Sequence, residues 1–195
     1  MLVYWSSFCC VKLVDSIYFR TKFSGLEHLP AQGPFILASN HLSNVDPFIL
    51  GSCRWRRFNY LAKIELFSTP AKAWFFRQVG AIPIKRGTSD FRALRDSLRG
   101  LKSGRPLILF PEGTRGHSGR TKEPQPGVGF LALKSKVPVI PVRIVGSDGG
   151  LPPGAKWFKF HPIKVIFGEK LEFAPGDDYA QVAQKILTAI YALNP

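Results

Sequence analysis

The sequence predicts an α/β domain with a layered, mostly parallel central sheet flanked by helices, preceded by an N-terminal amphipathic helical segment. Short apolar runs alternate along the chain with longer segments of helical periodicity, and Gly or Pro separates them. Strands that alternate with helices usually form a parallel sheet covered on both faces. Because the 195 residues contain no repeat or linker, we expect residues 1–24 to form the N-terminal segment and residues 25–195 to form one domain.

The N-terminal segment is rich in large apolar residues, and its polar positions Lys12, Asp15, Ser16 and Arg20 recur at helical spacing. Lys12 and Asp15 interrupt the ~18–20 apolar residues that a membrane-spanning helix needs. We therefore expect an amphipathic, membrane-associated helix that lies in the headgroup zone. The alternative is a helix that packs onto a soluble core. The segment also lacks the positively charged start of a signal peptide.

The remaining elements follow from apolar runs and from the residues that start and stop helices. Strands are predicted at residues 35–38, 58–62, 81–84, 106–110, 139–145 and 163–167. Helices are predicted to begin at Pro47 with Asp46 as N-cap, after Thr69-Pro70, after a Ser89 or Asp90 cap with Gly104 as the stop, and to occupy residues 128–136 and 180–193.

The charge balance indicates an anionic partner. Lys and Arg number 27 against 13 Asp and Glu, a net charge of +14, which suits nucleic acid, a membrane surface or phosphorylated substrates. Nucleic acid is disfavoured because the chain has no zinc-finger spacing, no aromatic RNA-binding strand and no continuous basic helix. Cys9, Cys10 and Cys53 form neither a disulfide framework nor a metal-ligand cluster, so we expect a reducing, cytoplasmic compartment and no metal.

His41 and Asp46 form the first candidate for catalysis. His41 follows the predicted strand at 35–38, and Asp46 lies five positions later at a predicted helix start. In a turn of this kind the carboxylate can accept a proton from one ring nitrogen, which leaves the other nitrogen as a general base. The simpler interpretation is that His41 is an ordinary loop residue and Asp46 only a helix cap.

Four blocks of sequence resemble those of the glycerolipid acyltransferases. Asn40-His41-Leu42-Ser43-Asn44-Val45-Asp46 is similar to their N-H-x-x-x-x-D block, and Phe110-Pro111-Glu112-Gly113-Thr114-Arg115 to their F-P-E-G-T-R block. Residues 80–86 resemble the block between these two, and residues 137–142 the proline-containing strand that follows them. Pro83 and Lys85 depart from the usual aromatic and acidic residues of the middle block, which leaves the acceptor less certain than the reaction type.

The resemblance implies transfer of a fatty acyl group from acyl-CoA or acyl carrier protein to the sn-2 hydroxyl of lysophosphatidate, which gives phosphatidate. His41 would be the general base and Asp46 its orienting partner. Arg86, Glu112, Gly113, Thr114 and Arg115 would bind substrate, with Lys85 as a further candidate. The thioester is a co-substrate, and no separate cofactor is expected.

Three alternatives remain at this point. The acceptor could be another lyso-lipid, such as a lyso-ornithine lipid, or the protein could be a non-catalytic basic module that binds anionic lipid. Arg86 and Arg115 could also belong to a solvated basic surface. Ser43 lies in the same loop as His41, but no G-x-S-x-G elbow surrounds it, so we expect direct attack of the acceptor on the thioester without an acyl-enzyme. We expect the enzyme to act at the cytoplasmic face of the cell membrane.

Overall fold

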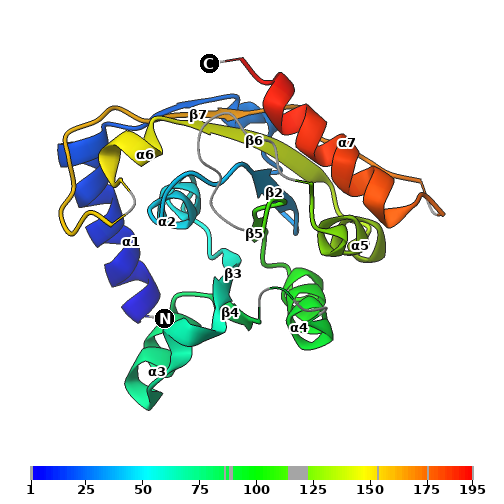
Figure 1. The fold of residues 1–195 in the computed structure, drawn as a ribbon, viewed down its shortest axis with the longest axis horizontal. Coiled ribbons are helices and arrows are strands. Elements are labelled where there is room, and N and C mark those ends of the chain that lie inside the picture. Colours follow the sequence, from blue (N-terminus) through cyan, green and yellow to red (C-terminus); the bar gives the residue numbers. More distant parts are fainter. Residues whose placement is uncertain are drawn as a thin grey trace.

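The computed structural model describes residues 2–85, 87, 90–113, 123–152, 154–174 and 176–194. A seven-stranded sheet with the order β1-β7-β6-β2-β5-β3-β4 crosses the molecule, with helices on both faces (Figure 1). Its strands are β1 (Lys22–Ser24), β2 (Ile36–Ser39), β3 (Asn59–Lys63), β4 (Ala81–Ile84), β5 (Leu107–Leu109), β6 (Val139–Val145) and β7 (Lys164–Phe167).

Most strand pairs are parallel, as the alternation of strands and helices predicts. Pairs β1–β7, β6–β2, β2–β5, β5–β3 and β3–β4 are parallel, and among the paired strands of the described residues only β6–β7 is antiparallel. The helices are α1 (Leu2–Val14), α2 (Asp46–Gly51), α3 (Pro70–Gln78), α4 (Phe91–Lys102), α5 (Pro126–Ser135), α6 (Ser147–Gly150) and α7 (Tyr179–Ala192). The mixed α/β class and the flanking helices are therefore confirmed.

The caps that start two of the helices are those expected from the sequence. Thr69 Oγ1 accepts a hydrogen bond from Lys72 N at 3.3 Å at the start of α3. Of the two candidates before α4, Asp90 is the cap, because its Oδ1 accepts from Ala93 N at 3.0 Å. Gly104 follows α4 with a φ of +81°, a left-handed conformation that glycine adopts without strain.

The sheet separates two apolar layers because successive residues of a strand point to opposite faces. On one face Phe35 and Leu37 pack with the side chains of α2 and with part of α1. On the other face Ile36 and Ala38 pack with α4, α5 and α7. All four of these β2-segment side chains are fully buried, so β2 is the centre of the core and its end is held firmly.

Helix α1 packs along one edge on the body of the domain. Tyr4 and Phe8 are buried, and the Tyr4 hydroxyl donates to Arg56 O and accepts from Phe58 N, both at 3.0 Å. Residues Leu2–Phe19 also form an 18-residue helical stretch that is long and apolar enough to cross a membrane, with 22% of it buried. One edge of the helix packs on the core, as the alternative expects, while Leu13 and Ile17 are exposed. Contact of the exposed side with a membrane stays a prediction.

Two details of the N-terminal segment differ from the sequence analysis. Asp15 is not on an exposed polar stripe: the helix ends in a π-helical turn (Asp15–Phe19), and the buried Asp15 carboxylate accepts hydrogen bonds from the backbone N–H and hydroxyl of Thr21. In addition, residues 22–24 belong to the sheet, because β1 pairs with β7. A three-residue strand without an apolar run gives no sequence signal of its own.

Candidate active site

Asn40 follows β2, and its side chain continues the pairing of β2 with β6. Asn40 is buried, its Nδ2 donates to Ile144 O at 2.9 Å, and its Oδ1 accepts from Ile144 N at 2.7 Å. The amide thus pairs with β6 as one more strand residue would, beyond the last β2–β6 pair, Ser39 and Val142. These two bonds fix the position at which the following residue, His41, emerges from the sheet.

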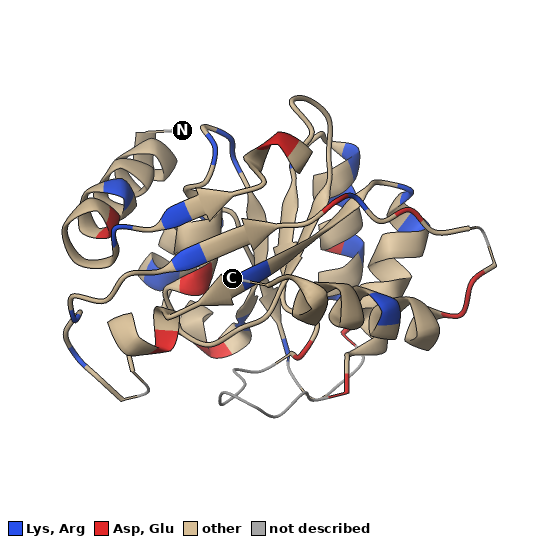
Figure 2. Ribbon diagram, turned by 90° about the horizontal axis from the view of Figure 1, so that it is seen from above, with Lys and Arg blue, Asp and Glu red and all other residues tan. Residues whose placement is uncertain are grey.

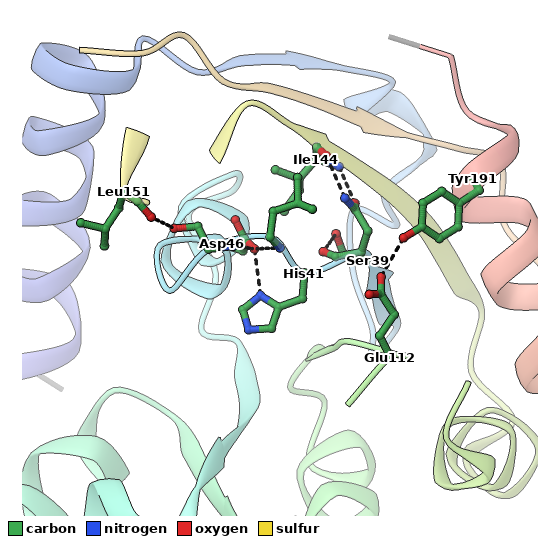
Figure 3. A network of polar contacts seen from close by, with 10 residues as sticks. Ser39, His41, Asp46, Glu112, Ile144, Leu151 and Tyr191 are labelled. Atoms are coloured by element: carbon green, nitrogen blue, oxygen red, sulfur yellow. Dashed lines mark hydrogen bonds and ion pairs between the residues drawn. The ribbon is translucent and has the colours of Figure 1, made fainter. Parts of the chain in front are cut away.

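His41 and Asp46 make the contact that their spacing predicts. His41 Nδ1 lies 2.8 Å from Asp46 Oδ2, and the same oxygen accepts from Leu42 N at 2.7 Å and from Ser43 N at 2.8 Å (Figure 3). His41 is 6% exposed and Asp46 is fully buried. With Nδ1 engaged as donor to the carboxylate, Nε2 is the ring nitrogen that can take up a proton.

The predicted role of Asp46 as helix N-cap is wrong. Helix α2 begins at Asp46 itself, Val45 precedes it in helical conformation, and no side chain caps the helix. The carboxylate turns back toward the residues before the helix because their two N–H groups and the imidazole offer three donors there. One carboxylate oxygen thus sets both the shape of the loop and the orientation of the ring.

The neighbouring strand β5 brings the block Phe110–Gly113 to the same edge of the sheet. The Phe110 ring stacks on His41, with 4.1 Å between ring centroids and 20° between planes. Gly113 has a φ of +67°, and its N–H donates to Phe110 O at 3.0 Å, so the chain turns sharply after β5. Glu112 lies inside this turn and is 3% exposed.

Glu112 is held by a residue from the C-terminal helix. The Tyr191 hydroxyl donates to Glu112 Oε1 at 2.9 Å (Figure 3). Arg143, a residue of β6, contacts Tyr191 twice. Its guanidinium lies 4.9 Å from the centroid of the Tyr191 ring, and its Nη1 donates to Tyr191 O at 2.9 Å. Burial and the adjacent Glu112 carboxylate raise the pKa of Tyr191 to about 12, so the phenol stays protonated and remains a donor.

The other residues expected at the site fall into two groups. Arg86, Thr114 and Arg115 lie outside the described residues. Lys85 is exposed, and its backbone N–H donates to Asp90 Oδ2 at 2.9 Å. Strand β4, which precedes Lys85, lies at one edge of the sheet, two places from β5 in the sheet order.

Ser43 is buried, and its hydroxyl donates to Leu151 O at 3.0 Å. This hydrogen bond leads to the segment after α6 rather than to His41. Ser43 therefore links two loops, which fits the expectation that it is structural. Its backbone N–H adds to this role by donating to Asp46.

An apolar cavity of about 600 Å³ opens beside the His41–Asp46 loop, between α1, α2, β3 and α3. Pro47 and Phe48, the two residues after Asp46, form part of its wall, and Leu2, Val3, Phe8 and Val11 of α1 line another side. This size and lining are typical of pockets that hold apolar ligands. The cavity thus begins where the His41–Asp46 loop ends.

Sequence reasoning missed Tyr191, Arg143 and the role of Asn40. Tyr191 lies 79 residues from Glu112, and nothing in its own helix distinguishes it from an ordinary apolar-face aromatic. Asn40 belongs to a block that was recognised, but its function depends on β6, which lies 104 residues away. Only the three-dimensional neighbours reveal these roles.

Among the residues that the structure describes, Lys and Arg lie on both helices and strands (Figure 2).

Comparisons with known sequences place these features in a family. The family described as Acyltransferase matches residues 20–145, which include both the His41–Asp46 loop and Glu112. The 1-acyl-sn-glycerol-3-phosphate acyltransferase of Bacillus subtilis is 30% identical over 184 residues, covering 91% of this chain and 86% of the relative. A lyso-ornithine lipid O-acyltransferase of Pseudomonas aeruginosa is 33% identical over 144 residues, covering 72% of this chain and 53% of the relative.

A chloroplast 1-acyl-sn-glycerol-3-phosphate acyltransferase of Brassica napus is 28% identical over 178 residues, covering 87% of this chain and 52% of the relative, so the chain spans about half the length of this plant protein. Among solved structures, the 1-acyl-sn-glycerophosphate acyltransferase PlsC of Thermotoga maritima has the same fold, with a TM-score of 0.77 and 24% identity over 98% of this chain and 81% of that one. With a family match over more than half of its length and a Bacillus relative aligned almost end to end, the chain belongs to the acyltransferase family.

Proposed function

We propose that the protein transfers a fatty acyl group from acyl-CoA or acyl carrier protein to the sn-2 hydroxyl of lysophosphatidate, giving phosphatidate. The observation that carries this proposal is the 2.8 Å contact between His41 Nδ1 and Asp46 Oδ2 at the end of the central strand, one strand away from Glu112. The names of the Bacillus and Brassica relatives support lysophosphatidate as the acceptor.

In the proposed reaction His41 Nε2 removes the proton of the acceptor hydroxyl while the oxygen attacks the thioester carbonyl carbon. The tetrahedral intermediate then collapses, the C–S bond breaks, and the proton passes from Nε2 to the leaving thiolate. Asp46 orients the ring and stabilises the imidazolium between the two proton transfers. General base catalysis of this kind contributes typically ~10²–10⁴-fold to the rate.

The acceptor's phosphate is assigned to Arg86 and Arg115, because a guanidinium matches two phosphate oxygens at once. Glu112 cannot attract a phosphate, and we assign it to the glycerol part of the acceptor or to the orientation of Arg115. Accordingly, Arg115→Ala should raise KM for lysophosphatidate more than KM for the acyl donor. Equal effects on both constants would count against this assignment.

We assign the apolar cavity beside the loop to a fatty acyl chain. Its walls are almost wholly apolar, and it begins at Pro47 and Phe48, next to the residue that holds the catalytic ring. Replacing Val79, a lining residue from the end of α3, by Phe should therefore shift the preferred donor to shorter chains. An unchanged chain-length profile would remove this assignment.

We further propose that the protein is monotopic and works at the cytoplasmic face of the membrane. The exposed Leu13 and Ile17 of the N-terminal helical segment would enter the headgroup zone, while Tyr4 and Phe8 keep the helix on the body of the domain. Removal of residues 1–20 is a poor test because it also removes Tyr4 and Phe19 from the core. Leu13→Ser with Ile17→Ser tests the same idea without that loss, and it should weaken co-sedimentation with liposomes.

A thioester-release assay with and without lysophosphatidate tests the main proposal. Wild-type protein should release thiol and form phosphatidate only when the acceptor is present, and His41→Ala should abolish both while the melting temperature stays close to that of wild type. A lipid panel separates the second candidate, acylation of a lyso-ornithine lipid, which the Pseudomonas relative favours. Absence of turnover with every acceptor, together with intact lipid binding by His41→Ala, would instead identify a non-catalytic lipid-binding module.

A further inference from the structure

The connection between α6 and β7 exposes three aromatic side chains within four residues. Trp157 is 83% exposed, Phe160 74% and Phe158 40%. We call residues 155–161 the aromatic loop. Soluble proteins seldom expose neighbouring large apolar residues unless the patch binds a partner. None of these three residues belongs to the catalytic site described above.

The backbone of the aromatic loop is fixed to the rest of the domain. Lys159 N donates to Gly150 O at 2.8 Å, and His161 N donates to Tyr18 O at 2.9 Å. The His161 ring packs so closely on α6 that a Cβ at Gly149 would lie 2.6 Å from it. The exposed rings are therefore presented by a backbone that is held in place.

The loop is continuous with the end of the N-terminal helical segment. The Phe160 ring stacks on Tyr18 with 4.9 Å between centroids, and Phe158 meets Phe19 edge to face at 5.5 Å. Exposed Leu13 and Ile17 belong to the same segment, Leu2–Phe19, which has the length and apolarity of a membrane helix. The aromatic loop thus packs on Tyr18 and Phe19, at the C-terminal end of that segment.

The charges of the loop fit an anionic surface. Lys156 and Lys159 are exposed among the aromatic residues, and the stretch from Gly149 to Gly168 contains no Asp or Glu. Tryptophan and lysine together are characteristic of membrane interfaces, where the ring enters the headgroup region and the ammonium meets lipid phosphate.

We propose that the aromatic loop is a second membrane contact that inserts Trp157 and Phe160 into an anionic bilayer beside the N-terminal helix. This inference rests on the proposed membrane association and adds a site to it. Two contacts with the same bilayer fix the tilt of the domain. A single helix at the membrane would leave the domain free to rotate about the helix axis.

Co-sedimentation with vesicles of phosphatidylcholine and phosphatidylglycerol tests the loop. Trp157→Ser with Phe160→Ser should weaken partitioning at least tenfold. The matched control is Phe91→Ser on α4, which removes an equally exposed ring (71%) from the opposite face of the sheet and should leave partitioning unchanged. Equal partitioning of the double variant and wild type would overturn the proposal.

The role of Lys156 and Lys159 is tested by comparing two double variants that change the net charge equally. Lys156→Gln with Lys159→Gln should reduce partitioning into anionic vesicles, by about fivefold for each lysine, and should have little effect on neutral vesicles. Lys134→Gln with Lys185→Gln, on α5 and α7, makes the same change in net charge and should have a smaller effect. A similar loss in both pairs would show that net charge alone acts, and it would refute a specific role for the loop.

A third measurement tests whether the Trp157 side chain enters the bilayer. Trp157→Phe keeps an aromatic ring, so it should bind vesicles nearly as well as wild type but show less quenching of tryptophan fluorescence by brominated lipids. If quenching is unchanged, Trp157 does not enter the bilayer. A wild-type dimer that Trp157→Ser with Phe160→Ser converts to monomers, without loss of vesicle binding, would assign the loop to contact between two copies of the chain.

Failure of this inference is distinguishable from failure of the proposed function. Turnover of a short-chain lysophosphatidate that is monomeric in solution does not need a bilayer. The loop variants should keep that activity while they lose vesicle binding. If wild-type protein lacks the activity but the loop variants still lose binding, the acyltransferase proposal fails and the loop proposal stands.

Discussion

The substitution Asp46→Asn tests the centre of the proposed site. Asp46 Oδ2 accepts three hydrogen bonds, from His41 Nδ1, Leu42 N and Ser43 N, at 2.8, 2.7 and 2.8 Å. Asp46 Oδ1 is buried and has no hydrogen-bond partner among the described residues. The amide of Asn can therefore place its oxygen at the Oδ2 position and its nitrogen at the Oδ1 position, which preserves the geometry and removes the charge.

The expected loss of stability follows from those three bonds. Hydrogen bonds to a charged group contribute ~1.5–3 kcal/mol and neutral ones ~0.5–1.5 kcal/mol, so the substitution weakens each bond by about 1 kcal/mol and all three by about 3 kcal/mol. At roughly 2–4 °C per kcal/mol for a domain of this size, the melting temperature should fall by about 6–12 °C. The protein should still fold at 25 °C.

The effect on turnover should be larger than the effect on folding. Without a carboxylate the imidazolium loses its stabilising partner, and the corresponding substitution in a Ser-His-Asp enzyme lowers kcat about 10⁴-fold. We expect kcat for thioester release to fall by ~10²–10⁴-fold, equivalent to about 3–5 kcal/mol, with little change in either KM. Steady-state kinetics and thermal unfolding on the same preparation measure both quantities.

Asp15→Asn is the matched control because Asp15 is also a buried carboxylate that accepts hydrogen bonds from its own neighbourhood, at the end of the N-terminal helix. It should lower the melting temperature and leave kcat unchanged. The reasoning is refuted if Asp46→Asn destabilises the protein but keeps kcat within about threefold of wild type. In that case the carboxylate serves the fold alone.

Three further outcomes follow from the contacts described above. Tyr191→Phe should raise KM for the acceptor several-fold with kcat and donor KM little changed, since Glu112 loses its 2.9 Å donor, whereas Tyr179→Phe on the same helix should alter none of them. Burial raises the pKa of Cys53 to about 12, so only about one Cys53 thiol in ten thousand is ionised at pH 8. Mass spectrometry should therefore find Cys53 unmodified by iodoacetamide until the protein unfolds. Asp90→Ala should lower the free energy of unfolding by about 1 kcal/mol through loss of the α4 cap. Because N–H donors lower the pKa of the Asp90 carboxyl below 3.8, the stabilisation by this carboxylate is present above that pH and is lost as the pH falls through the folded pKa. Urea unfolding at several pH values would measure both effects.

Strands β2 to β7 could be predicted closely because each is an apolar run between residues that break secondary structure. Strands β4 and β6 have the bounds expected residue for residue. The contact between His41 and Asp46 could also be predicted, because the two residues are five positions apart and the loop between them is short. Local patterns therefore account for β2 to β7 and for the His41–Asp46 pair.

Features that depend on distant partners could not be predicted. Asp46 Oδ2 accepts from Leu42 N and Ser43 N as well as from His41, whereas the sequence pattern favoured a helix cap for the same side chain. Strand β1 exists because β7 offers it a partner. The support of Glu112 by Tyr191 requires that α7 return across the sheet, a packing outcome that no single segment encodes.

The position of Tyr4 has a practical consequence for work on this protein. Its hydroxyl satisfies Arg56 O and Phe58 N, and seven other residues of α1 form part of the cavity wall. Shortening the chain before β1 to gain solubility would leave those backbone groups unpaired and open the cavity to water. The first helix should therefore be kept in any sample intended for kinetics or crystallisation, with detergent chosen to cover its outer side.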